Sequence, residues 1–291
     1  DEKLDVTADV KVYNFGAASL RYWVPIKGSF KALVELSARL VENERMDSAA
    51  RIEINRLIDI TKGVVSGPSD IGFETYAVFY VTELNKKVSG KVLLSQESDA
   101  IARMLCCEER DIDVQELDDA IKNPLRYFSD DLVLIDWNAA LVYDPRKSYE
   151  ALDVIEYAVI ELLELRTYDV LLDKSLEKAY EDIRKRSLGF TNPLSRILRD
   201  LSTVRLEVSD VIDKVENSLK MLGDLYLVKV YNAAAGRFYL ESWKESVRNK
   251  LNTVMNTYTM LSEKREAQRM FILELSVVAL FIIEIFLFFR E

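Results

Sequence analysis

The chain has 291 residues, 49% of them hydrophobic and 30% charged, with a net charge of −10. Its length suggests two domains or one large domain, and its scarce glycine and proline argue against a disordered or fibrous protein. The acidic balance argues against direct nucleic-acid binding, which needs a basic face to neutralise phosphates. Histidine is absent, which excludes Ser-His-Asp and Cys-His catalysis and every histidine-containing metal site.

Other signatures of catalysis are weak. The stretch Ser89-Gly90-Lys91 lacks the upstream glycine of a phosphate-binding loop. Cys106 and Cys107 are adjacent, so they form neither a spaced disulfide framework nor, as two thiols, a zinc site. Acidic pairs are suited to holding Mg²⁺, although in a chain with 49 acidic residues solvated loops are the simpler interpretation. These pairs are Asp111/Asp113, Asp118/Asp119 and Asp130/Asp131.

The N-terminal half, residues 1–145, mixes strand and helix patterns. Residues 9–14 and 19–24 gather β-forming side chains on either side of a glycine and predict a β-hairpin. Residues 30–46 carry apolar side chains at helical spacing, and Ser29 is suited to cap that helix.

The rest of this half predicts further short elements, so that an α+β domain is the simplest fold. The expected elements are a helix over 51–60 (or a strand opening at 51–54), a strand over 73–83 paired with one over 88–94, a helix over 95–109, and two short strands within 131–144.

Residues 146–269 predict a helical, coiled-coil-like stalk domain. Long helices are expected over 147–186 and 194–231, and a third begins at Arg237 and continues into the following segment. On the third helix apolar residues recur about every 3.5 residues, the period of a coiled coil. This stripe packs either within the chain, as an antiparallel hairpin with the preceding helix, or against a second copy. Its members are Leu240, Trp243, Val247, Leu251, Val254, Tyr258 and Leu261.

The C-terminal segment 270–289 reads MFILELSVVALFIIEIFLFF. At about 1.5 Å per residue it is about 30 Å long, the hydrocarbon thickness of a bilayer. We therefore predict a single transmembrane helix in a tail-anchored protein, with a buried core helix as the alternative. The basic residues that flank the span predict a cytoplasmic body. They are Lys264, Arg265 and Arg269 before it and Arg290 after it.

Three polar side chains interrupt this apolar segment, namely Glu274, Ser276 and Glu284. Carboxylates within a membrane usually face protein or water rather than lipid. These residues are therefore candidates for packing against another membrane helix, with contact to the lipid headgroups as the alternative for Glu274.

The C-terminal third resembles the required-for-meiotic-nuclear-division family in the order of certain residues. These are Trp243, Arg248, Leu251, Asn252, Tyr258, Leu273-Glu274 and Ile283-Glu284. The opening at 12–18, VYNFGAA, is similar to that family's aromatic–glycine–hydrophobic start, and 151–180 is similar to uncharacterised prokaryotic relatives. The resemblance implies an α+β domain, a long helical region, a C-terminal anchor and homo-oligomers. Eukaryotic members are mitochondrial inner-membrane proteins linked to translation at the membrane.

We therefore expect a C-terminally anchored, self-associating scaffold or tether whose body faces the cytoplasm, or the matrix in mitochondria. Its expected partners are membrane lipid, further copies of itself, and another protein or a translation-related assembly; no enzymatic activity and no cofactor are expected. The alternatives are a membrane-bound hydrolase using carboxylates and a metal ion, and a channel-like oligomer. The expected ranges are 1–145 for the α+β domain, 146–269 for the stalk and 270–289 for the transmembrane helix.

Overall fold

The computed structural model describes residues 6–13, 16–40, 43–61, 72–184, 201–203, 206 and 224–288. The chain divides into two compact units. Unit 1 comprises Asp1–Thr167 and Asp210–Trp243, and unit 2 comprises Tyr168–Ser209 and Lys244–Glu291. This division is based on contacts between residues, whereas the predicted domain ranges were based on sequence patterns. Those ranges stay a prediction.

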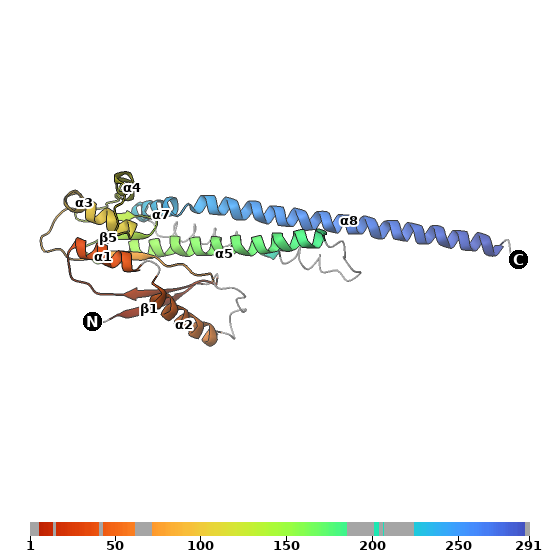
Figure 1. Ribbon diagram of the computed structural model, residues 1–291, viewed down its shortest axis with the longest axis horizontal. Coiled ribbons are helices and arrows are strands. Elements are labelled where there is room, and N and C mark those ends of the chain that lie inside the picture. The colour runs from red at the N-terminus through yellow and green to blue at the C-terminus, as the bar shows by residue number, and fades with distance from the viewer. Residues whose placement is uncertain are drawn as a thin grey trace. The chain divides into compact units, whose positions relative to one another are not determined.

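Most of the regular elements belong to unit 1 (Figure 1). Its strands are β1 (Thr7–Val12), β2 (Ala18–Trp23), β3 (Ala77–Val81), β4 (Leu132–Ile135) and β5 (Ala139–Tyr143). Its helices are α1 (Phe30–Leu40), α2 (Glu44–Thr61), α3 (Gly90–Cys106), α4 (Val114–Ala120) and α7 (Leu225–Arg237). Two helices extend from unit 1 into unit 2, namely α5 (Glu150–Arg184) and α8 (Leu240–Phe288).

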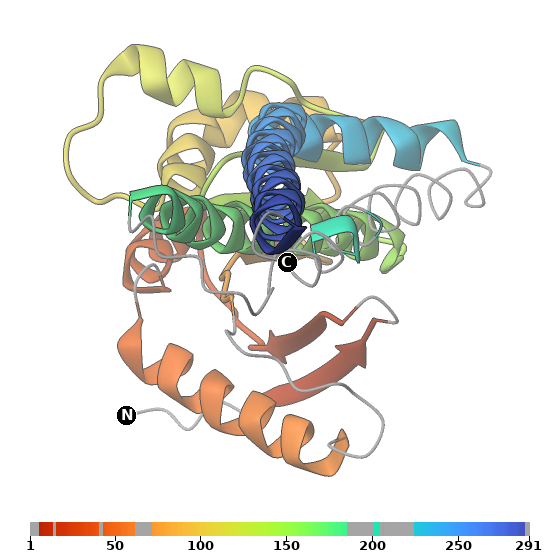
Figure 2. The same ribbon diagram turned by 90° about the vertical axis from the view of Figure 1, so that its right-hand side faces the viewer.

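Strands β1 and β2 form the predicted antiparallel hairpin, with Val12 opposite Ala18. Gly16 lies in the turn with φ near +104°, a backbone conformation that glycine adopts without steric cost. Tyr13 N donates a hydrogen bond to Ala17 O at 2.9 Å and closes the turn. Figure 2 shows the hairpin, in dark red, beside α2.

The second sheet of unit 1 has the order β3-β5-β4, with β3 parallel and β4 antiparallel to β5. The two strands predicted within 131–144 are therefore confirmed. Every residue of β4 and β5 is buried, so both faces of these strands are covered, which explains their continuous apolar sequence. On one face the fully buried Ile101, Met104 and Leu105 of α3 contribute to the core, and α3 also packs against α1 and α4.

Several predicted elements differ from those observed. The predicted helix over 30–46 is divided, because α1 ends at Leu40 and α2 begins at Glu44. The predicted strand over 88–94 is wrong, because α3 begins at Gly90, and the Ser89 side chain accepts a hydrogen bond from Val92 N at 3.2 Å. Most of the predicted helix over 194–231 lies outside the described residues.

In unit 2, α5 and α8 run in the same direction where ion pairs join them (Figure 1). Lys250 Nζ lies 2.9 Å from Asp169 Oδ1 and 2.7 Å from Asp173 Oδ2. One turn earlier on α8, Ser246 Oγ donates a hydrogen bond to Asp169 Oδ1 at 3.1 Å. The apolar stripe of α8 is buried in this unit at Val247, Leu251, Val254, Tyr258 and Leu261.

The C-terminal end of α8 corrects the transmembrane prediction. Among the described residues, none of the helices combines the length and the apolarity that crossing a bilayer requires. Glu274 and Glu284 interrupt the apolar run, and Arg269 immediately precedes it; a charged side chain near the centre of a span costs about 2.5–3.5 kcal/mol. The single-pass, tail-anchored localisation rested on the predicted span at 270–289 and is therefore not supported.

Candidate functional site

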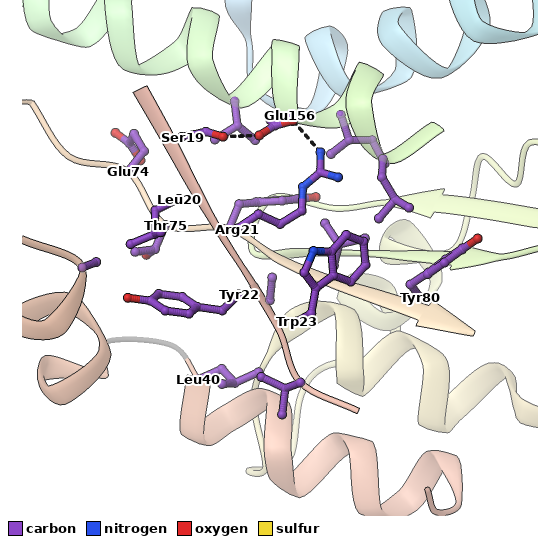
Figure 3. A pocket seen from close by; sticks show the side chains of 18 of the residues that line it. Ser19, Leu20, Arg21, Tyr22, Trp23, Leu40, Glu74, Thr75, Tyr80 and Glu156 are labelled. Atoms are coloured by element: carbon purple, nitrogen blue, oxygen red, sulfur yellow. Dashed lines mark hydrogen bonds and ion pairs between the residues drawn. The ribbon is translucent and has the colours of Figure 1, made fainter. Parts of the chain in front are cut away.

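Unit 1 contains a cleft of about 2860 Å³. One wall is formed by β2 with the residues up to Gly28, together with α1 and α2. Residues 72–85, which include β3 and are called the β3 segment, form the opposite side. The first turns of α5 complete the lining. Figure 3 shows side chains of β2 and of the β3 segment reaching into this space.

Four charged side chains attach the hairpin to α5 along the cleft. Arg21 Nη2 lies 2.7 Å from Asp153 Oδ1 and 2.5 Å from Glu156 Oε2. Lys11 Nζ contacts the same two atoms at 2.7 and 2.9 Å. Ser19 Oγ donates a further hydrogen bond to Glu156 (Figure 3). Two cations and two carboxylates thus neutralise one another beside the cleft, and Arg21 and Glu156 of this network line it.

The pKa shifts in this network favour its charged forms. Burial lowers the pKa of Arg21, but its hydrogen bond to Asp153 and the charge of Glu156 outweigh burial and raise it. Burial raises the pKa of Asp153, and hydrogen bonds from Lys11 and Arg21 lower it by more. Groups held in their charged forms at neutral pH are poorly suited to exchanging protons with a substrate.

Aromatic rings join the ends of β2 and β3. The ring centroid of Tyr149 lies 5.4 Å from that of Trp23 and 5.8 Å from that of Tyr80. Trp23 Nε1 donates a hydrogen bond to Asp9 Oδ2 at 2.6 Å, which fixes the indole. Burial, followed by the charge of Asp144, raises the pKa of Tyr80 to about 12, so its hydroxyl is protonated at neutral pH.

The other end of the β3 segment is held by Glu74 and Arg166. The Nη1 atom of Arg166 lies 2.5 Å from Glu74 Oε1. Its guanidinium also lies over the rings of Trp137 and Trp243, at 5.5 and 5.4 Å from their centroids. Trp243, expected in the self-association stripe, therefore contacts Arg166 inside unit 1.

Most of the cysteines and acidic residues singled out in the sequence are at least partly buried, cap a helix or form ion pairs. Burial raises the pKa of Cys106 to about 11 and of Cys107 to about 12, which disfavours the thiolate. Among the acidic pairs, Asp113 caps α4, Asp119 pairs with Arg237, and Asp130 and Asp131 pair with Arg146. Within the described ranges no cluster of three or more Cys, Asp or Glu side chains is placed to hold a metal ion.

The predicted packing residues on α8 have two kinds of surroundings. Leu240 and the stripe from Val247 to Leu261 are buried in the chain. Glu274, Ser276 and Glu284 are exposed, and Ser276 Oγ donates a hydrogen bond to Leu273 O at 2.7 Å. A single chain does not test self-association through either set, so it stays a prediction.

Some of the basic residues that were expected to set the orientation in the membrane lie outside the described residues. Lys264 and Arg269 are exposed on α8. The side chain of Arg265 and the whole of Arg290 lie outside the described residues. These positions do not test the roles predicted for the four residues.

Sequence reasoning missed the charged network of the cleft. Lys11 and Arg21 lie on one face of the hairpin, because Lys11 is opposite Ser19 and Arg21 is opposite Asp9. Asp153 and Glu156 are three residues apart and share one face of a helix. These two local patterns were the sequence features that could have indicated the network. Nothing in the sequence, however, indicates that the hairpin contacts α5.

Comparison with known proteins corrects the expected family. Residues 1–150 match the family described as "Uncharacterized protein MJ0711, N-terminal domain". A relative, "Uncharacterized protein MJ0711" of Methanocaldococcus jannaschii, is 24% identical over 220 residues, which cover 75% of this chain and 67% of the relative. No solved structure matches the chain significantly.

The resemblance to the required-for-meiotic-nuclear-division family is therefore wrong, and the membrane-anchored scaffold it suggested is not supported. The VYNFGAA opening around Gly16 is also what a β-hairpin turn requires, since glycine there adopts a positive φ. The spaced apolar residues of the C-terminal third are also what a packed helix requires. Neither pattern distinguishes one family from another.

Proposed function

The chain belongs to the family of the "Uncharacterized protein MJ0711, N-terminal domain", whose match covers the five strands that the structure describes in unit 1, and we propose that unit 1 is a protein-binding module. Its cleft binds a segment of another protein and performs no chemistry on it. The observation that carries this proposal is the combination of a large cleft with charges that are already paired.

The size of the cleft favours a macromolecular ligand. Pockets for small molecules and cofactors typically have volumes of about 300–1,000 Å³, whereas this cleft has about 2860 Å³. Its walls include the aromatic rings of Trp23, Tyr80 and Tyr149, and aromatic side chains are enriched at the centres of protein interfaces. These features fit a binding surface for a polypeptide.

The side chains of the cleft give little support to catalysis. Glu156, a carboxylate of the lining, is paired with Lys11 and Arg21. The pKa of the Tyr80 hydroxyl is raised to about 12, so it does not act as a base near pH 7. The described lining therefore offers contacts to a ligand and no activated nucleophile.

Selection of peptides on the intact chain tests this function. Random decapeptides displayed on phage are selected on the wild type and counted on two variants, Tyr149→Ala and Tyr180→Ala. Tyr149 lines the cleft, whereas Tyr180 is an exposed tyrosine of α5 that does not line it. We expect enriched peptides that bind Tyr180→Ala normally and Tyr149→Ala at least about tenfold more weakly. Peptides that ignore both changes, or no enrichment at all, would contradict the proposal.

A further inference from the structure

Two strand edges line the cleft. In the part of the chain that the structure describes, the sheets are β1-β2 and β3-β5-β4, so β2 and β3 each have one edge that pairs with no strand. All residues of β2 and all residues of β3 belong to the lining of the cleft. Such edges present backbone N–H and C=O groups that can pair with another extended chain.

The two strands run in the same general direction along the cleft. Figure 3 places Ser19 and Leu20 of β2 near Glu74 and Thr75 at one end, and Trp23 and Tyr80 toward the other. At that second end both rings contact Tyr149. The two strands are therefore matched in direction, and Tyr149 contacts a side chain of each.

We propose that an extended, uncharged polypeptide segment binds in the cleft as an added β-strand between β2 and β3. This inference rests on the proposed function and specifies its mode of binding. Alternate residues of a strand direct their N–H and C=O groups to opposite sides, so one inserted strand can pair with both edges. The two sheets would then form one continuous sheet with the order β1-β2-ligand-β3-β5-β4.

The balanced charges near the cleft indicate that the bound peptide segment is uncharged. Lys11 and Arg21 are balanced by Asp153 and Glu156, and the pair Arg166–Glu74 is balanced as well. A charged side chain placed beside these pairs would lose hydration and face both signs at once. Half-buried positions occur along the whole of β2, where apolar and β-branched side chains of a partner gain most by burial.

The test uses a fluorescein-labelled peptide of about eight residues, alternating valine and threonine with one central tyrosine. Two further versions carry N-methyl groups on the odd or on the even residues, which removes the N–H donors directed to one side. Binding to the full-length chain is followed by fluorescence anisotropy. We expect the parent peptide to bind and each N-methylated version to bind at least about tenfold more weakly, because each loses one of the two edges.

Hydrogen exchange supplies a second measurement. With the parent peptide bound, amides of β2 and β3 exchange more slowly, whereas those of β5, which lies between two strands, do not change. Equal binding of all three peptides would overturn strand addition while leaving a side-chain-mediated protein-binding site intact. A parent peptide that does not bind would also overturn strand addition. The chain could instead dimerise and protect the amides of β2 and β3 from exchange. If the peptide does not reverse this dimerisation, the occupant of the cleft is a second copy of the chain and not the peptide.

Discussion

Arg21 of β2 and Glu156 of α5 form an ion pair of 2.5 Å although they lie 135 residues apart in the sequence. Both side chains are largely buried, with 19% and 13% of their surfaces exposed. Lys11 and Asp153 complete the same network, so four charged side chains join the hairpin to α5, together with an edge-to-face contact between Tyr13 and Tyr157. The position of β2, which lines the cleft, therefore depends in part on these polar contacts.

Removing one cation should loosen this attachment. We expect Arg21→Met to lower the free energy of unfolding by about 1–3 kcal/mol, because it leaves a largely buried carboxylate with fewer partners. The matched control is Arg56→Met, since Arg56 is 74% exposed and pairs with Glu53 only at 3.5 Å; it should change stability by less than about 0.5 kcal/mol. Urea unfolding measures both. Equal effects would show that the network adds no stability.

The same network predicts a dependence on acid. The pKa of Asp153 is lowered from 3.8 in the folded chain. Its contribution is therefore fully present above pH 3.8 and is lost as the pH falls through the folded pKa. Asp153→Asn should be less stable than the wild type at pH 6, and this difference should shrink well below pH 3.8. Urea midpoints at several pH values provide the test, and a difference independent of pH would contradict it.

Local sequence patterns were sufficient to predict the strands that pair with the next strand in the sequence. The β1–β2 hairpin and the β4–β5 pair follow from β-forming residues on either side of a turn. The parallel pairing of β3 with β5 joins segments separated by α3, α4 and β4, and no local pattern specifies such a partner. Residues 88–94 have β-forming side chains, but the Ser89 cap and burial of Leu93 stabilise a helix.

The candidate site was harder to predict than the fold around it. Each of its charges looks like an ordinary surface residue in the sequence, because Lys11, Arg21, Asp153 and Glu156 become partners only when the hairpin reaches α5. The free edges of β2 and β3 likewise appear only once the sheet order is known. Absence of histidine was informative about catalysis, but it indicated nothing about where a partner would bind.

The cysteine environment predicts slow thiol chemistry. Burial raises the pKa of Cys106 to about 11 and of Cys107 to about 12, so little thiolate exists at pH 8. We expect the native chain to react with Ellman's reagent at least about tenfold more slowly than the chain unfolded in guanidinium chloride. Rapid reaction of both thiols in the native chain would show that they are accessible and ionised. The absorbance at 412 nm follows the reaction.

Two helical glycines make opposite predictions for the same substitution. A Cβ added at Gly90 would lie 2.0 Å from the backbone oxygen of Asp131, whereas at Gly236 nothing lies within 4 Å. We expect Gly90→Ala to destabilise the chain by about 3 kcal/mol or more, because backbone on both sides must move. Gly236→Ala in α7 should stabilise it by about 0.5–1 kcal/mol, since alanine favours a helix. Thermal and urea unfolding measure both, and a neutral Gly90→Ala would show that α3 does not begin against Asp131.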